Sequence, residues 1–153
     1  VKHHECIPCF LKTWEQRWYL IAEPLNRKNP SVYALERTSN LQLTEQQLSP
    51  SPHINPQSYF EGCYGVNHED CNPVPIKIKV YGSQVDYVRA RPIHASQEEV
   101  EQGDGWSVFS YWLRPSYNFY QMLLWHREKV EVMEPKEVRG EMKKIVNQIS
   151  KQY

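Results

Sequence analysis

The pattern of apolar and polar residues predicts a strand and then a helix near the middle of the chain. Apolar and polar residues alternate along IKIKVY, residues 76–81, as in a strand with one buried face. In SQVDYVRAR, residues 83–91, Ser83 and Asp86 fit a capping box, and Pro92 should end the short helix. A strand followed at once by a short helix therefore opens the second part of the chain.

The same reasoning predicts the elements that follow. Two strands, IHASQEE (93–99) and WSVFSYWLR (106–114), flank a turn at GDG (103–105). Ser116 should cap a helix, VEVM (130–133) forms a fourth strand, and a last helix follows Pro135. That last helix carries a stripe of apolar residues at helical spacing: Val138, Met142, Ile145, Val146 and Ile149. The order β-α-β-β-α-β with an added helix is that of a ferredoxin-like sandwich.

The first part of the chain has strand patterns and few helix signals. Strands are predicted near 6–12, 16–22 and 31–36, and LQLTEQQL (41–48) is either a further strand or a turn of helix. Several short strands joined by tight turns suggest a small β-barrel. The overall fold class is thus α+β.

Proline-rich stretches divide the chain. SPSPHINP (49–56) and NHEDCNPVP (67–75) have the composition of turns and linkers. We expect a barrel over 1–48, a linker and connecting segment over 49–73, and a ferredoxin-like domain over 74–153.

Composition narrows the classes of protein. Lysine plus arginine equals aspartate plus glutamate at 18 each, so any basic site is local. No apolar stretch approaches the roughly 18 residues that span a bilayer, and the first residues lack the apolar block of a signal peptide. We therefore expect a cytoplasmic protein that does not contact membranes.

The four cysteines leave two interpretations. Cys6 and Cys9, with His3, His4 and the more distant His68, resemble a scattered zinc set, but Cys63 and Cys71 do not form the second close pair of a zinc ribbon. In a reducing compartment all four would remain thiols. We predict no metal and no cofactor.

A series of short motifs resembles a known family. Pro8-x-x-Leu11 precedes Arg17-Trp18-Tyr19-Leu20, and Tyr33-Ala-Leu35-Glu-Arg37 follows. Later stretches, YFEGCYGV, SQEEV and LLWHREKVEVMEP, complete the series. In this order they resemble the WYL-domain family of bacterial transcriptional regulators, together with its C-terminal extension domain.

The resemblance implies a small Sm-like or SH3-like barrel that senses nucleotides or single-stranded nucleic acid, and an extension that helps to form a homodimer. In this family DNA is bound by an N-terminal winged helix-turn-helix, which we expect to be absent here together with the first barrel strand. The chain also departs from the pattern, because Ala34 and His4 stand where arginines are usual. These departures reduce the positive charge of the implied site.

Strand geometry splits the RWYL motif between two faces. Alternate side chains point to opposite sides, so Trp18 and Leu20 share one face while Arg17, Tyr19 and Ile21 share the other. We predict that Trp18 and Leu20 fill the barrel core. Tyr19 is equally consistent with a core position and with a ligand contact.

Arg37 is the leading candidate for ligand binding, because its planar guanidinium can grip a phosphate and stack on a base. The alternative is a surface ion pair with Glu36 or Glu45. Lys12 and Arg17 are the next candidates for ligand binding after Arg37, although each alone is also explained as a solvated strand residue. With Trp14 and Tyr19 they combine the cations and aromatic rings that bind single-stranded nucleic acid.

No arrangement of residues indicates catalysis. The sequence has no glycine-rich phosphate loop and no serine, histidine and aspartate set in a recognisable context. We predict a regulatory module rather than an enzyme. A structural dimerisation module without a small ligand is the alternative function.

Overall fold

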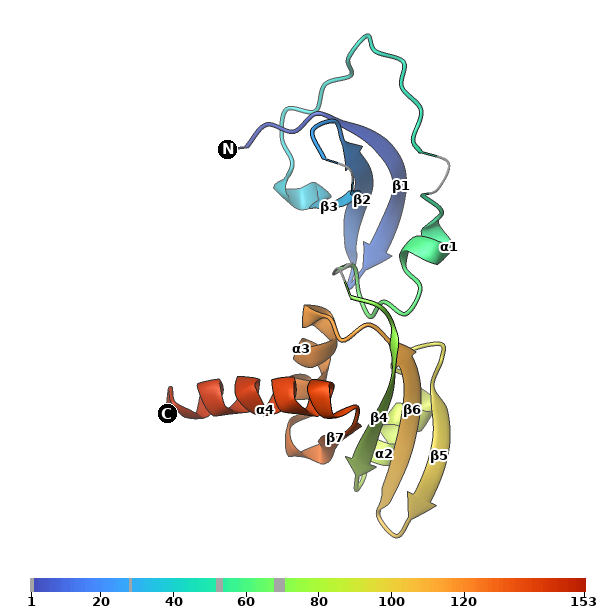
Figure 1. Ribbon diagram of the computed structural model, residues 1–153, viewed down its shortest axis with the longest axis vertical. Coiled ribbons are helices and arrows are strands. Elements are labelled where there is room, and N and C mark those ends of the chain that lie inside the picture. Colours follow the sequence, from blue (N-terminus) through green and yellow to red (C-terminus); the bar gives the residue numbers. More distant parts are fainter. Residues whose placement is uncertain (1, 28, 52–53, 68–70) are drawn as a thin grey trace. The chain divides into compact units, whose positions relative to one another are not determined.

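The computed structural model describes residues 2–27, 29–51, 54–67 and 71–153, and the chain divides into two compact units (Figure 1). The first unit is Val1–Phe60 and the second is Glu61–Tyr153. Each unit has its own antiparallel sheet. We describe them separately.

The first unit is built on a three-stranded meander. The elements are β1 (Cys6–Trp14), β2 (Arg17–Pro24), β3 (Ser31–Ala34), the 3₁₀ helix η1 (Leu35–Arg37) and the short helix α1 (Pro56–Tyr59). The strands pair in the order β1-β2-β3, so β2 is the central strand of the sheet. All three strands that the sequence predicts in this part are confirmed.

Two details of this unit differ from the prediction. The third strand ends at Ala34 and the chain turns into η1, because Thr38 N and Oγ1 both donate to the carbonyl oxygen of Leu35, at 3.1 and 2.8 Å. Residues 41–48 form neither a strand nor a helix. Leu41, Leu43 and Leu48 are all exposed there, so no apolar contact favours a regular element.

The β1–β2 hairpin closes through a two-residue turn. Trp14 pairs with Arg17, and the intervening Glu15 and Gln16 have φ angles of 48° and 63°. Two consecutive positive φ values are typical of a type I′ turn, whose twist matches that of the paired strands. The turn therefore places Trp14 and Arg17 side by side at the end of the hairpin.

The second unit has the predicted ferredoxin-like order, and the α+β fold class is confirmed. Its elements are β4 (Val74–Tyr81), α2 (Gln84–Ala90), β5 (Glu98–Gly103), β6 (Trp106–Leu113), α3 (Tyr117–Trp125), η2 (Arg127–Lys129), β7 (Val130–Glu134) and α4 (Lys136–Ser150). The sheet order is β5-β6-β4-β7 with antiparallel neighbours. Each strand–helix–strand segment therefore crosses over one intervening strand, as in a split βαβ fold.

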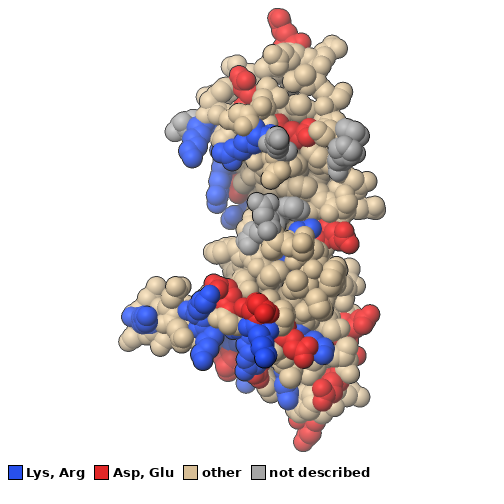
Figure 2. All heavy atoms as spheres, viewed as in Figure 1, with Lys and Arg blue, Asp and Glu red and all other residues tan. Residues whose placement is uncertain are grey.

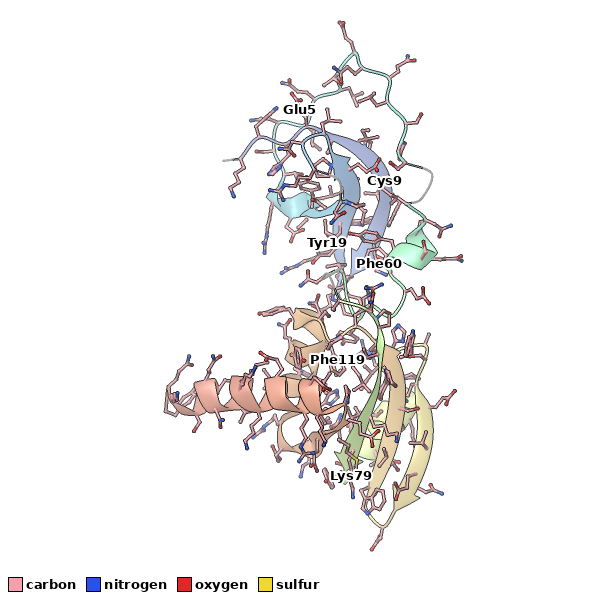
Figure 3. All side chains as sticks on the ribbon, in the orientation of Figure 1. Glu5, Cys9, Tyr19, Phe60, Lys79 and Phe119 are labelled. Carbon is pink, nitrogen blue, oxygen red and sulfur yellow. The ribbon has the colours of Figure 1, made fainter. Side chains whose placement is uncertain are left out.

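The core of the second unit lies between the sheet and its helices. The alternation in 76–81 is confirmed, because Ile76, Ile78 and Val80 are fully buried. Phe109 from β6 and Phe119 from α3 are the largest fully buried side chains of this core, and Phe119 is labelled in Figure 3. Ser116 caps α3 as predicted, with its buried Oγ accepting from Phe119 N at 3.4 Å.

Two predictions for this unit are wrong. Ser83 makes no capping hydrogen bond, because its own backbone is helical and Val85 N donates to the carbonyl oxygen of Gly82. Residues 93–97 are not part of a strand, since β5 begins at Glu98. Before that point Ser96 Oγ, rather than a backbone ladder, accepts from Trp112 N at 2.9 Å.

Only part of the apolar stripe of α4 is covered. Val138 is buried in the core and Met142 packs against it. Val146 and Ile149 are 46% and 39% exposed. The C-terminal half of α4 leads away from the sheet of its own unit (Figure 1).

Candidate functional site

Four of the five predicted binding residues lie on one face of the first sheet. Lys12 on β1 stands opposite Tyr19 on β2, and Trp14 stands opposite Arg17. Directly paired residues of an antiparallel sheet point to the same face, and residues two apart along a strand do so as well. We call Lys12, Trp14, Arg17 and Tyr19 the hairpin face.

Aromatic rings support one side of the hairpin face. The Nζ atom of Lys12 lies 4.2 Å from the centroid of the Phe60 ring. Phe60 and Tyr59 each contact Phe10 edge-on, with ring centroids 6.0 Å apart. Figure 3 shows Phe60 next to α1 and Tyr19 on β2. The segment that ends at Phe60 therefore packs on the face that carries Lys12.

The cations of the site differ in their partners. Arg17 Nη1 lies 3.6 Å from Glu36 Oε1, in a pair whose side chains are 58% and 44% exposed. Glu36 thus pairs with Arg17 and not with Arg37. Arg37 is exposed on η1 and forms no ion pair with any residue in 2–27, 29–51, 54–67 or 71–153. It is carried by η1, which packs against β2, rather than by a strand.

The opposite face of the hairpin contradicts one prediction. Trp18 is 54% exposed and Leu20 is half-buried, so Trp18 is not a core residue. Trp18 stands opposite Thr13, on the face away from Lys12, whereas the Tyr59 and Phe60 rings contact Phe10 on the Lys12 face. The buried residues of β2 are instead Ile21, Ala22 and Pro24, farther from the hairpin turn.

No local sequence pattern reveals the contributions of Phe60, Phe10 and Glu36. Phe60 follows the proline-rich stretch, about 50 residues after the strand that it packs against. Nothing in a local pattern connects positions so far apart. The predicted strand over 31–36 suggests Glu36 only as a partner of Arg37, whereas the structure pairs it with Arg17.

The cysteines of β1 are partly buried free thiols. Burial raises the pKa of both Cys6 and Cys9, which disfavours the thiolate that binds metals. In the part of the chain that the structure describes, no group of three or more His, Cys, Asp or Glu side chains could hold a metal ion. His68 lies outside the described residues.

Several cations of the second unit are paired with carboxylates. Arg89 on α2 contacts Glu99 at 2.6 Å and Asp86 at 3.3 Å. Lys77 pairs with Glu134 at 3.1 Å. Figure 2 shows acidic and basic atoms intermixed over this unit, whereas basic atoms gather on one side of the first unit. No described helix is both long enough and apolar enough to cross a membrane.

Comparison with known proteins places the second unit in a family. No curated protein sequence matches the chain. A solved structure of proteasome accessory factor B/C (PafBC) of Arthrobacter aurescens aligns with 91% of this chain and 21% of its own length, at 17% identity and a TM-score of 0.39. The chain therefore spans about a fifth of that protein.

A family model, the WCX domain, matches residues 72–150. The match confirms the resemblance of this region to the extension domain that accompanies WYL domains. Because it covers more than half of the 153 residues, the chain belongs to the WCX-domain family.

Proposed function

We propose that this chain is the ligand-sensing regulatory region of a bacterial transcriptional regulator that acts in the cytoplasm. It binds a nucleotide or a short single-stranded nucleic acid on the hairpin face, with Arg37 as a further contact. Binding modulates the attachment of an N-terminal helix-turn-helix to DNA. The barrel over 1–48 senses the ligand, and residues 49–73 connect it to the extension over 74–153.

One observation carries this proposal, namely the pairing of cations with aromatic rings across two strands. Lys12 stands opposite Tyr19, and Arg17 stands opposite Trp14. Cations contact phosphate groups, and aromatic rings stack on bases for about 1–3 kcal/mol per base. Each cross-strand pair on the hairpin face thus offers one group for the backbone and one for a base.

The few charges on the hairpin face fit a site of modest, salt-dependent affinity. The chain as a whole is neutral, and the hairpin face supplies two cations while Glu36 opposes one of them. Affinity for nucleic acid rises with the number of phosphates neutralised, so two or three contacts give modest binding that falls with salt. Modest affinity suits a sensor that must release its ligand.

Fluorescence anisotropy with labelled oligothymidylate and labelled cyclic nucleotides tests the site. We expect the wild-type chain to bind, and Arg17→Ala and Arg37→Ala each to weaken binding about three- to tenfold. Lys151→Ala removes one exposed cation from the other unit and serves as the matched control. Equal binding by all four proteins, or binding by none, would refute the assignment.

The exposed end of α4 supports a second function, the formation of a homodimer. Val146 and Ile149 are exposed at helical spacing, and Met142 continues the same stripe toward the core. Burying such a stripe against a second copy would remove apolar surface from water, at roughly 25 cal/mol per Å².

Sedimentation velocity separates the two functions. Ile149→Lys should convert a dimer to a monomer, whereas Gln148→Lys, exposed on the same helix beside the stripe, should leave the dimer intact. If the chain is a dimer and no ligand of the panel binds, the structural function is favoured. A wild-type monomer at all concentrations would exclude it.

A further inference from the structure

The pair between Arg17 and Glu36 lies within the proposed binding surface. Arg17 is one of its two strand cations, and the Glu36 carboxylate approaches Arg17 Nη1 to 3.6 Å. Both side chains remain largely exposed to solvent. A phosphate group that reaches this guanidinium therefore meets a negative charge that is already there.

The backbone keeps Glu36 beside the hairpin face. Ala34 on β3 stands opposite Tyr19 on β2, so the sheet register brings the end of β3 next to the site. The chain then enters η1, which is closed by two hydrogen bonds from Thr38 to the carbonyl oxygen of Leu35. Glu36 is the central residue of this turn, and its position does not depend on a flexible loop.

We propose that Glu36 is a built-in competitor for Arg17, which sets the affinity of the hairpin face for anionic ligands. This inference rests on the proposed function, because it needs a ligand that binds there. In the free protein the Glu36 carboxylate pairs with the Arg17 guanidinium. A ligand phosphate displaces it, and the released carboxylate returns to solvent.

The chemistry of the pair suits such an exchange. An exposed ion pair is weak, because water screens the charges and two side chains must be held in one geometry. Breaking it therefore costs little. A phosphodiester of the ligand offers arginine two acceptor oxygens, as a carboxylate does, so it competes for the same guanidinium. Glu36 lowers the affinity of the site without blocking it.

Arg17 and Arg37 differ in their relation to Glu36. Arg37 follows Glu36 directly, yet it forms no ion pair among the residues that the structure describes. It therefore keeps its full capacity for a ligand phosphate. The acid acts on Arg17 alone, so its effect should depend on Arg17 and not on Arg37.

Anisotropy titration of a labelled six-nucleotide oligothymidylate tests this idea with Glu36→Gln. The amide keeps the size of the side chain and removes its charge, so we expect binding about two- to fivefold tighter than in the wild type. Glu45→Gln makes the same change of net charge at an exposed position of the same unit and should alter binding much less. In an Arg17→Ala background, Glu36→Gln should have almost no effect.

The outcomes separate the two claims. Tighter binding by Glu36→Gln that disappears without Arg17 supports the competitor. A wild type that binds while Glu36→Gln is unchanged, or is matched by Glu45→Gln, overturns the competitor and leaves the proposed function in place. If neither the wild type nor Glu36→Gln binds, the proposed function fails and the competitor fails with it.

Discussion

At the scale of single residues, an aromatic ring restricts the position of Lys12 on the sheet. Its aliphatic chain lies on the face that Phe10 and Phe60 share, and its ammonium group lies over the Phe60 ring. A cation above an aromatic ring gains roughly 0.5–1 kcal/mol at a partly exposed site. The contact restricts Lys12 without neutralising it, so the charge stays available to a ligand.

Truncating Phe60 should therefore weaken both stability and binding. We expect Phe60→Ala to lower the free energy of unfolding by about 1–3 kcal/mol, less than for a fully buried ring. Urea denaturation measures the loss. Phe60→Leu keeps most of the apolar volume and should recover most of the stability, but not the position of Lys12. Full stability in Phe60→Ala would show that the ring does not pack as described.

A second residue-scale feature is the network around Glu131. Tyr81 Oη donates to Glu131 Oε2 at 2.7 Å, and Arg139 Nη1 lies 2.8 Å from Glu131 Oε1. The Tyr81 hydrogen bond, followed by the Arg139 interactions, lowers the pKa of Glu131. A carboxylate whose pKa is lowered by folding stabilises the fold when the pH is above its pKa in the unfolded chain, near 4.3. This stabilisation is lost as the pH falls through its pKa in the folded protein.

Glu131→Gln should therefore be less stable than the wild type at pH 7, and the difference should shrink as the pH falls below about 4. Urea denaturation at several pH values between 3 and 7 measures it. Glu101→Gln, at an exposed position on β5, is the control. A gap between Glu131→Gln and the wild type that stays constant with pH would contradict the network.

At the scale of elements, two serines that look alike in the sequence behave differently. Ser116 is fully buried and caps α3, whereas Ser83 is exposed and caps nothing. The difference comes from Gly82, whose φ of 61° and backbone bond to Val85 start α2 without a side-chain cap. A capping pattern alone does not reveal which solution the backbone takes.

Ser116→Ala should lower the free energy of unfolding by about 1 kcal/mol, because Phe119 N then loses its acceptor inside the protein. The matched change Ser83→Ala should stay within about 0.5 kcal/mol of the wild type. Thermal denaturation compares the two. Equal losses would mean that the assigned cap is wrong.

The β1–β2 turn is a second element whose sequence is not optimal. Glu15 and Gln16 both adopt positive φ, which costs roughly 1 kcal/mol or more for residues other than glycine, asparagine or aspartate. Replacing them by Asn-Gly should raise the free energy of unfolding by about 1 kcal/mol and leave the hairpin face in place. Urea denaturation tests this. A lower stability would indicate a different turn.

Much of the element structure could be predicted from periodicity. The ferredoxin-like order follows from residues such as Ile76, Ile78 and Val80, whose alternation reflects a sheet with one buried face. Trp18 was misassigned because alternation shows which residues share a face, not which face is covered. Coverage depends on α1 and Phe60, which the chain brings back from far along the sequence.

At the scale of the whole molecule, the candidate binding residues and the larger core lie in different units. The second unit has the larger buried core, and its Arg89 and Lys77 are paired with acids. The first unit carries the hairpin face, and Figure 2 shows basic atoms gathered on one of its sides. Net charge conceals this arrangement, because 18 basic and 18 acidic residues cancel over the full chain.

The candidate residues could be selected from the sequence, but their arrangement could not. Strand alternation placed Arg17 with Tyr19, and only the hairpin register added Lys12 and Trp14 to the same face. The pairing of Glu36 with Arg17 depends on the end of β3 at Ala34, which the pattern YALER does not reveal.

The salt dependence of oligothymidylate binding tests the central claim most directly. With two or three cations on the phosphates, the logarithm of the association constant should fall against the logarithm of salt concentration with a slope of about −1.4 to −2.1. The double variant Lys12→Ala/Arg17→Ala should lose most binding, while Lys136→Ala/Lys151→Ala, with the same change of charge on the other unit, should keep both affinity and slope. Equal affinities and slopes for the two double variants would contradict a nucleic-acid site on the hairpin face.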